Sequence, residues 1–213
     1  MRRALPFSLL LLTCSASNLL AEKNVSLETK LAAVSSPQVS ESFDKAIAEP
    51  MIGVKGEWTV TDGTLVGKEL ASDQHAAVLS FQKKNRDSVV RFSFKADGNT
   101  KGFNFSLNHA KGHLFRVVIT PASISINLDK DKKDPESKAV VLATAKGKIE
   151  NGEWHTLQVE MVGDCVRAQT DGGLKVEASH PKLNTEKPNY RFVMSGDSLS
   201  IDDLQIWEIE SAN

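Results

Sequence analysis

The chain contains very little cysteine. Of its 213 residues only Cys14 and Cys165 carry a thiol, and Cys14 lies in a leader segment at residues 1–21. Without that leader Cys165 is alone, so an intrachain disulfide is excluded. The paired thiolates that structural zinc sites use are missing as well. We therefore expect Cys165 to pack within a strand and not to act as a nucleophile.

The chain also lacks an excess of charge of either sign. It has 26 basic and 27 acidic residues, and residues 1–21 hold two arginines and no acidic residue. Without the leader the balance is therefore 24 basic against 27 acidic, a net charge of −3. This composition predicts no nucleic-acid partner. It also provides no polybasic patch for an anionic membrane surface.

Long apolar runs are missing except near the N-terminus. Residues 5–12 are apolar but too few to cross a bilayer as a helix, and Arg2 and Arg3 precede them. This order is typical of a secretory signal peptide, with cleavage near Ala16 or Ala21. We therefore expect a mature chain without a transmembrane segment, either secreted or located in the periplasm or cell envelope.

Helical periodicity is almost absent after the leader. Residues 22–40 are polar, and we expect them to form a linker with at most a marginal helical turn. Residues 41–210 show roughly a dozen short alternating strands separated by turn formers such as Asp62-Gly63. The pattern predicts an all-β domain over 41–210, a two-sheet antiparallel β-sandwich of the jelly-roll type.

Three successive strands carry the clearest alternation, at 88–95, 102–108 and 113–120. Because side chains alternate between the faces of a strand, one set points to the core. That set is Val90, Phe92, Phe94, Phe103, Phe105, Leu107, Phe115, Val117 and Ile119. We expect the three strands to be neighbours, so that their other faces form one polar surface.

The polar surface is the candidate ligand site. Arginine offers five fixed donors and asparagine offers both a donor and an acceptor, which suits hydroxyl-rich sugars. An aromatic side chain at this surface could stack on a sugar ring. The candidate binding residues are Arg91, Asn104, Ser106, Asn108, Arg116 and Trp207. The alternative is an ordinary solvated face of an antiparallel sheet.

Candidates for acid–base chemistry are weaker. Glycoside cleavage needs two carboxylates roughly 5–10 Å apart. Glu160 and Asp203 share the outward parity of their strands and could approach the polar surface if those strands flank it. The sequence does not place the two side chains together, so it leaves open whether the protein is an enzyme.

The sequence predicts no metal site and no cofactor. The loop 129–138 contains Asp-x-Asp-x-x-Asp, but it lacks the glycine and the distal glutamate of an EF-hand, and its lysines oppose a cation. We expect a solvated loop there, with a structural calcium ion as the alternative. His109 and His113 are four residues apart, yet Gly112 between them disfavours a helix. We expect loop histidines, with contact to a ligand or an ion as the alternative.

Four motifs resemble a known superfamily. Residues 57–67 match W-x-V-x-D-G-x-L-x-G, and residues 152–160 contain W-H-x-L-x-V. Asp171-Gly172 matches the hairpin that follows, and residues 202–206 match D-x-L-x-I. Together they resemble the concanavalin A-like lectin/glucanase superfamily, closest to secreted 3-keto-disaccharide hydrolase-like domains, which are related to family 16 glycoside hydrolase-like and laminin G-like domains.

The resemblance implies a jelly roll whose concave face often handles glycans. Superfamily members include glycosidases, lectins and non-catalytic adhesion modules, whereas the Glu-x-Asp-x-x-Glu set of family 16 glucanases is missing from this sequence. We therefore expect a secreted, glycan-binding domain that is non-catalytic or weakly catalytic, with a carbohydrate or cell-envelope glycan as partner. The alternatives are a glycoside hydrolase of the 3-keto-disaccharide group and a structural, laminin G-like adhesive module.

Overall fold

The structure of the protein is a computed structural model that describes residue 23 and residues 25–210. The expected signal peptide, both candidate cleavage positions and Cys14 lie outside the described residues. Within the described part, no helix is both long enough and apolar enough to span a membrane.

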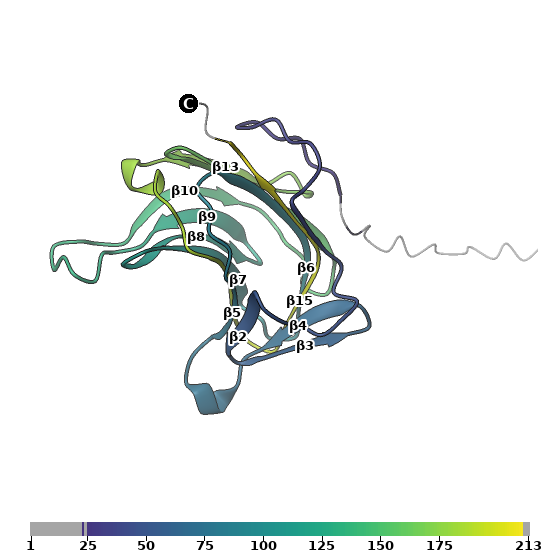
Figure 1. The fold of residues 1–213 in the computed structure, drawn as a ribbon. Coiled ribbons are helices and arrows are strands. Elements are labelled where there is room, and N and C mark those ends of the chain that lie inside the picture. Colours follow the sequence, from purple (N-terminus) through teal and green to yellow (C-terminus); the bar gives the residue numbers. More distant parts are fainter. Residues whose placement is uncertain (1–22, 24, 211–213) are drawn as a thin grey trace, which may run out of the picture.

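The domain is a sandwich of two antiparallel sheets, as the alternation predicted (Figure 1). Sheet A follows the order β13-β12-β11-β6-β15-β4-β3, and β1 pairs with β15. Its strands are β1 (Val39–Glu41), β3 (Glu57–Thr61), β4 (Thr64–Lys68), β6 (Ser88–Asp97), β11 (His155–Val162), β12 (Cys165–Thr170), β13 (Lys175–Ser179) and β15 (Ser198–Glu208).

Sheet B follows the order β10-β9-β8-β7-β14-β5-β2. Its strands are β2 (Met51–Lys55), β5 (Ala77–Phe81), β7 (Gly102–His109), β8 (Gly112–Thr120), β9 (Ser123–Leu128), β10 (Val140–Lys146) and β14 (Tyr190–Ser195). Two short 3-10 helices, η1 (Ala71–Asp73) and η2 (Pro181–Leu183), lie in connecting loops.

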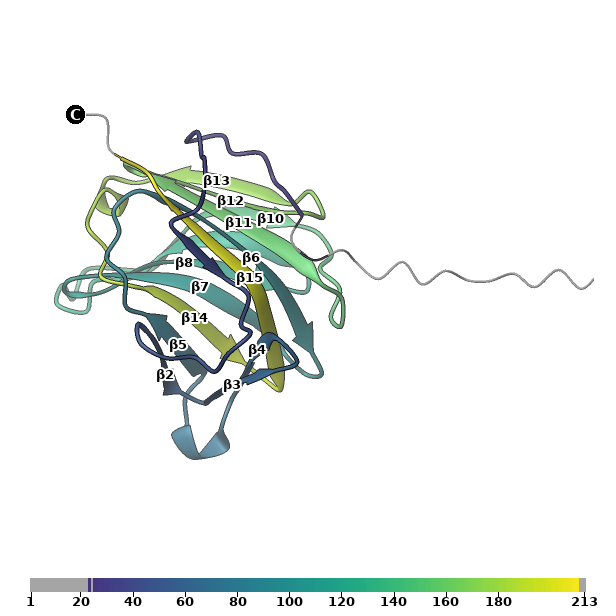
Figure 2. The same ribbon diagram turned by 45° about the vertical axis from the view of Figure 1, so that its right-hand side comes forward.

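The expected three-strand block is wrong in one respect, because β6 and β7 belong to different sheets. β6 pairs with β11 and β15 in sheet A, whereas β7 pairs with β8 and β14 in sheet B. Figures 1 and 2 show the two strands on opposite layers of the sandwich. Alternation determines which face of a strand is buried, but it does not determine which strand lies beside it.

A short loop makes the crossing between the sheets. Sheets pack roughly 10 Å apart, and four extended residues span about 13 Å, so residues 98–101 are long enough. Thr100 is buried and holds the loop in place, because its hydroxyl donates to the carbonyl oxygen of Ser198 (2.8 Å) and accepts from the Ser198 amide (3.0 Å). Gly102 then opens β7 at a φ of 141°, where a Cβ would lie 2.2 Å from the Ile119 carbonyl oxygen.

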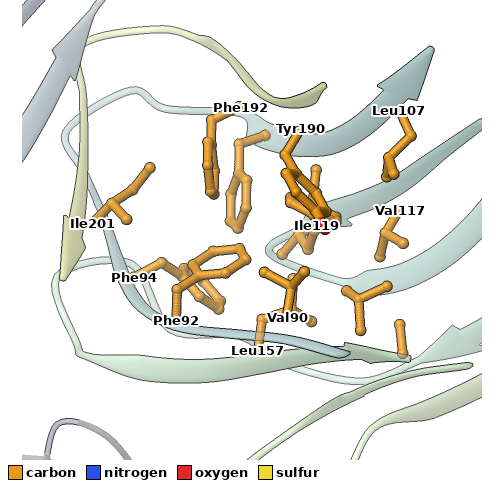
Figure 3. Packing of buried hydrophobic residues seen from close by; sticks show 14 of the residues in the cluster. Val90, Phe92, Phe94, Leu107, Val117, Ile119, Leu157, Tyr190, Phe192 and Ile201 are labelled. Carbon is orange, nitrogen blue, oxygen red and sulfur yellow. The ribbon is translucent and has the colours of Figure 1, made fainter. Parts of the chain in front are cut away.

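The predicted core residues are buried. The three on β6 face the six on β7 and β8 across the sandwich, because β6 belongs to the other sheet. All nine are at most 2% exposed. The rings of Phe94 and Phe103 have centroids 4.8 Å apart, and those of Phe92 and Phe192 are 5.0 Å apart in an edge-to-face arrangement (Figure 3). Sheet A thus contributes Phe92 and Phe94, and sheet B contributes the rings that pack against them.

We predict that Phe92→Ala lowers the free energy of unfolding by about 3–5 kcal/mol, because it leaves a cavity between the two sheets. Denaturant unfolding measures the change. The matched control is Val141→Ala, at a side chain that is 62% exposed, where the change should stay within about 0.5 kcal/mol. Equal effects of the two substitutions would contradict this assignment of the core.

Candidate functional site

The predicted polar surface divides between two outer faces, because β6 and β7 lie in different sheets. Arg91 and Trp207 lie on the outer face of sheet A. Asn104, Ser106 and Arg116 lie on the outer face of sheet B, together with Asn108 at the end of β7. The two faces must therefore be considered separately.

The outer face of sheet A is covered by the N-terminal segment. Residues 25–38, here called the strap, cross β11, β6 and β15 without regular secondary structure, where the sequence favoured a linker (Figures 1 and 2). The Val25 amide donates to the Thr156 hydroxyl (3.1 Å). The Glu28 carbonyl oxygen accepts from the side-chain amides of Gln158 (3.3 Å) and Gln169 (2.6 Å). The sheet therefore holds the strap largely through the strap's own backbone.

Glu160 is the centre of these contacts. Its carboxylate has no exposed surface, and its Oε2 accepts from the backbone amides of Lys30 (2.8 Å) and Leu31 (2.7 Å). Its Oε1 accepts from Arg167 Nη1 at 2.9 Å. A buried carboxylate is stable when paired and hydrogen-bonded in this way. In the described conformation Glu160 anchors the strap and is closed to an external ligand.

Asp203, the other carboxylate candidate, lies in a bulge of β15 with a φ of 49°. Burial and the neighbouring charge of Asp202 raise the pKa of Asp203, and Lys23 opposes them. Glu160 pairs with Val89 of β6, whereas Asp202 pairs with Ser93 of the same strand. Four residues along a strand span about 13 Å, so the register places the backbones of Glu160 and Asp202 far apart along the sheet.

Trp207 is also engaged by the strap. It is 5% exposed, and its indole N–H donates to the Ser35 carbonyl oxygen at 2.9 Å. The Arg91 guanidinium lies 4.9 Å from the centre of its ring and donates to Gln205 Oε1 at 2.7 Å. A pocket of about 470 Å³ remains between the strap and the sheet, and Arg91, Gln158 and Trp207 line its floor.

The outer face of sheet B carries a polar row that crosses four neighbouring strands. Arg191 on β14 pairs with Ser106 on β7, Ser106 pairs with Arg116 on β8, and Arg116 pairs with Asn127 on β9. Asn104 lies two residues along β7 from Ser106. Three of the predicted binding residues thus stay together on one face, and they are joined there by Arg191 and Asn127.

Sequence reasoning missed Arg191 and Asn127. Their outward direction was readable, because Tyr190 and Phe192 alternate with Arg191, and Ile126 and Leu128 alternate with Asn127. The neighbours of their strands were not readable. β14 lies far along the chain from β7, and only the sheet order brings the two strands together.

The two arginines of this row have different surroundings. Arg116 forms a two-pronged ion pair with Asp129, with Nη2 to Oδ1 at 2.6 Å and Nε to Oδ2 at 3.0 Å. The guanidinium of Arg191 is half-buried and has no hydrogen-bond or salt-bridge partner among the described residues. Burial, followed by the positive charge of Arg116, lowers the pKa of Arg191. The row therefore carries an uncompensated positive charge.

Two pockets open onto the outer face of sheet B. A pocket of about 180 Å³ is lined by Asn104, Ser106, His113, Arg116, Arg191 and His75. A second pocket of about 290 Å³ is lined by His109, His113, Asp129, Asp131, Asn184 and Thr185. His113 lines both. Figure 1 shows sheet B curving around this side of the sandwich, between the loop 129–139 and the loop that carries η1.

His113 belongs to a hairpin, and not to the loop that the sequence favoured. It lies in β8, and His109 ends β7. Burial lowers the pKa of His113, and the charge of Asp129 opposes that effect. The neutral form of the ring is therefore favoured. Its Nδ1 lies 3.1 Å from Asn108 Oδ1, so the tautomer with the proton on Nδ1 leaves Nε2 as an acceptor.

The loop 129–139 uses its acidic side chains in its own turns. Asp131 Oδ1 accepts from the Lys133 amide at 2.9 Å, and Asp134 Oδ1 accepts from the Glu136 amide at 3.0 Å. Within residues 25–210 no group of three or more His, Cys, Asp or Glu side chains is placed to hold a metal ion.

The comparisons with known proteins identify the fold. No model of a known family matches the chain, and no curated protein matches it. Among solved structures, carbohydrate-binding module CBM66 from Bacillus subtilis has a TM-score of 0.58 at 16% identity, covering 73% of this chain and 94% of that module. LamAcat from Zobellia galactanivorans has a TM-score of 0.58 at 12% identity, covering 81% of this chain and 98% of that chain.

A third similar structure is SCLam, a non-specific endo-β-1,3(4)-glucanase of family GH16. Its TM-score is 0.58 at 12% identity, over 83% of this chain and 93% of that chain. The sandwich therefore has the two-sheet jelly-roll fold that the sequence predicted, and it is similar in fold to these three structures. At these identities the likeness identifies the fold alone.

We predict that Glu160→Gln loosens the strap. Glutamine keeps one acceptor oxygen and adds an N–H group among three donors, so the free energy of unfolding should fall by about 1–3 kcal/mol. Hydrogen exchange at the Lys30 and Leu31 amides should become faster. The control is Glu177→Gln, which removes the ion pairs of a partly exposed carboxylate with Lys30 (2.7 Å) and Arg167 (3.8 Å) and should cost less than about 1 kcal/mol. Unchanged exchange in Glu160→Gln would contradict the anchoring role.

Proposed function

We propose that this domain binds glycans on the outer face of sheet B and acts as a binding module without a catalytic carboxylate pair. The observation that carries the proposal is the polar row, which is in register across β14, β7, β8 and β9 and open to two pockets. Carbohydrate-binding module CBM66 has a similar fold, which supports this class of function.

The chemistry of the row suits sugar hydroxyl groups. Arg116 is held in a fixed orientation by Asp129, so part of its donor array is pre-oriented. Asn104 offers a donor and an acceptor beside it. Because Arg116 is already held in place by Asp129, binding costs little further loss of side-chain entropy at that residue.

Sheet A is the less suitable face. Its polar side chains already hold the strap, and the aromatic ring that could stack on a sugar is covered. The pocket of about 470 Å³ beside Arg91 and Trp207 is bounded by the strap, so a larger ligand on that face would have to displace the strap and leave Glu160 without two of its donors. Binding on sheet B needs no such rearrangement.

We infer that the domain acts outside the cytoplasm, in the periplasm, at the cell envelope or in the medium. The support is the leader at residues 1–21, with two arginines, an apolar run and small residues. N-terminal sequencing of the exported protein tests the inference. A new N-terminus close to Ala16 or Ala21 is the expected result, and retention of Met1 would contradict it.

A hydrolase of the 3-keto-disaccharide group is the second candidate. The observation that favours it is that Asp129, Asp131 and His113 line one pocket. Asp129 is held by Arg116 and Asp131 caps its own loop, which suits structural roles for both. The binding proposal therefore expects no product when the purified protein is incubated with 3-keto-glycosides. Product formation that Asp131→Asn abolishes would favour the hydrolase.

We predict that Asn104→Ala weakens binding to the best ligand of a glycan array by about tenfold or more. The loss corresponds to one or two hydrogen bonds of about 1–1.5 kcal/mol each. Arg91→Ala is the matched control, because Arg91 lies on the other sheet under the strap, and its affinity should match that of the wild type. Loss of binding in Arg91→Ala together with full binding in Asn104→Ala would place the site on sheet A instead.

A further inference from the structure

Arg191 differs from the other arginines that the structure describes. Arg86 donates to Asn184, Arg91 to Gln205, Arg116 to Asp129 and Arg167 to Glu160. Among the described residues only the Arg191 side chain has no such partner, although it is half-buried. A buried charge normally has a partner of opposite sign, because the desolvated ion is otherwise costly.

The surroundings of Arg191 make this isolation more marked. Arg191 and Arg116 flank Ser106 on its two neighbouring strands, so their Cα atoms are about 10 Å apart across two strand spacings. Their long side chains both line the pocket of about 180 Å³. No carboxylate lines that pocket. Arg116 contributes to the lowered pKa of Arg191, and Asp129, the partner of Arg116, does not line the pocket beside Arg191.

We propose that this pocket receives the anionic group of an acidic saccharide, a uronate carboxylate or a sulfate ester, with Arg191 as its main contact. The inference rests on the proposed glycan binding and names its ligand class. A carboxylate or a sulfate offers two or more acceptor oxygens in the geometry that a guanidinium matches. Such a group would supply the partner that Arg191 lacks, and Ser106 and Asn104 would remain for neighbouring hydroxyl groups.

The charge distribution also gives the bound chain a direction. The pocket of about 290 Å³ adjoins the first through His113, and it is lined by Asp129 and Asp131 together with Lys182. Because Arg116 is neutralised by Asp129, the net positive charge lies at the Arg191 end of the row. The anionic residue should therefore sit over Arg191, and the rest of the saccharide should extend over Arg116 towards the second pocket.

The test is isothermal titration of the full-length mature protein with three matched ligand sets. These are oligo-uronates, the same oligosaccharides after reduction of their carboxyl groups to alcohols, and sulfated oligosaccharides of equal length. Wild-type protein should bind one of the acidic sets at least about tenfold more tightly than the reduced set, and the difference should shrink as salt is added. Whether the uronates or the sulfated set binds better identifies the source of the anion.

Three variants locate the preference. Arg191→Gln should lower the affinity for the acidic set to that for the reduced set, whereas Arg191→Lys should keep part of the preference through its charge. Arg91→Gln, an arginine change on the other sheet, should keep the wild-type preference. Thermal unfolding of each variant shows that the fold is retained.

The acidic-ligand inference and the proposed glycan binding fail on different results. If the reduced oligosaccharides bind as well as the acidic ones, or if Arg191→Gln keeps the preference, the acidic-ligand inference is overturned and glycan binding stands. If no saccharide of any set binds, glycan binding on sheet B falls, and the ligand inference falls with it. If free inorganic sulfate competes as strongly as the sulfated saccharide, the saccharide is not recognised and the inference is overturned.

Discussion

The packing of phenylalanine rings between the two sheets is the contact on which the rest of this domain depends. Phe92 and Phe94 of β6 face Phe103 and Phe192 of sheet B, with ring centroids between 4.8 and 6.3 Å apart. Because these strands meet through their apolar faces, their polar faces must point in opposite directions. One core thus creates two unrelated surfaces, and residues that are close in sequence, such as Arg91 and Asn104, serve different faces.

This geometry explains which features the sequence could predict. Burial and direction follow from alternation within a single strand, so the all-β sandwich and the nine inward residues were predictable. Strand neighbours depend on pairing between distant segments, which alternation does not encode. Arg191 illustrates the limit, because its outward direction was visible but its place beside Ser106 and Arg116 depends on the pairing of β14 with β7. The strap was equally hidden, since its contacts use backbone groups and leave little pattern in side chains.

The two outer faces differ in whether a buried charge has a partner within the protein. On sheet A, the buried carboxylate of Glu160 accepts hydrogen bonds from the Lys30 and Leu31 amides and from Arg167, so its charge is compensated within the protein. On sheet B, the half-buried guanidinium of Arg191 receives no acceptor from the described residues. Folded chains rarely leave a desolvated charge unmatched without a reason, and such exceptions gather at functional sites. The contrast between the two faces therefore supports the proposal that a ligand binds on sheet B.

The same fold supports both binding modules and hydrolases, so the chemistry of the face must decide between them. Acid–base catalysis needs groups that are free to exchange protons with a substrate. Here Arg116 contacts both oxygens of Asp129, and Nδ1 of His113 lies 3.1 Å from Asn108 Oδ1, while burial lowers the pKa of His113. These pairs keep donors and acceptors in fixed positions, which is what recognition needs. Their fixed geometry therefore supports the proposal that sheet B holds a saccharide.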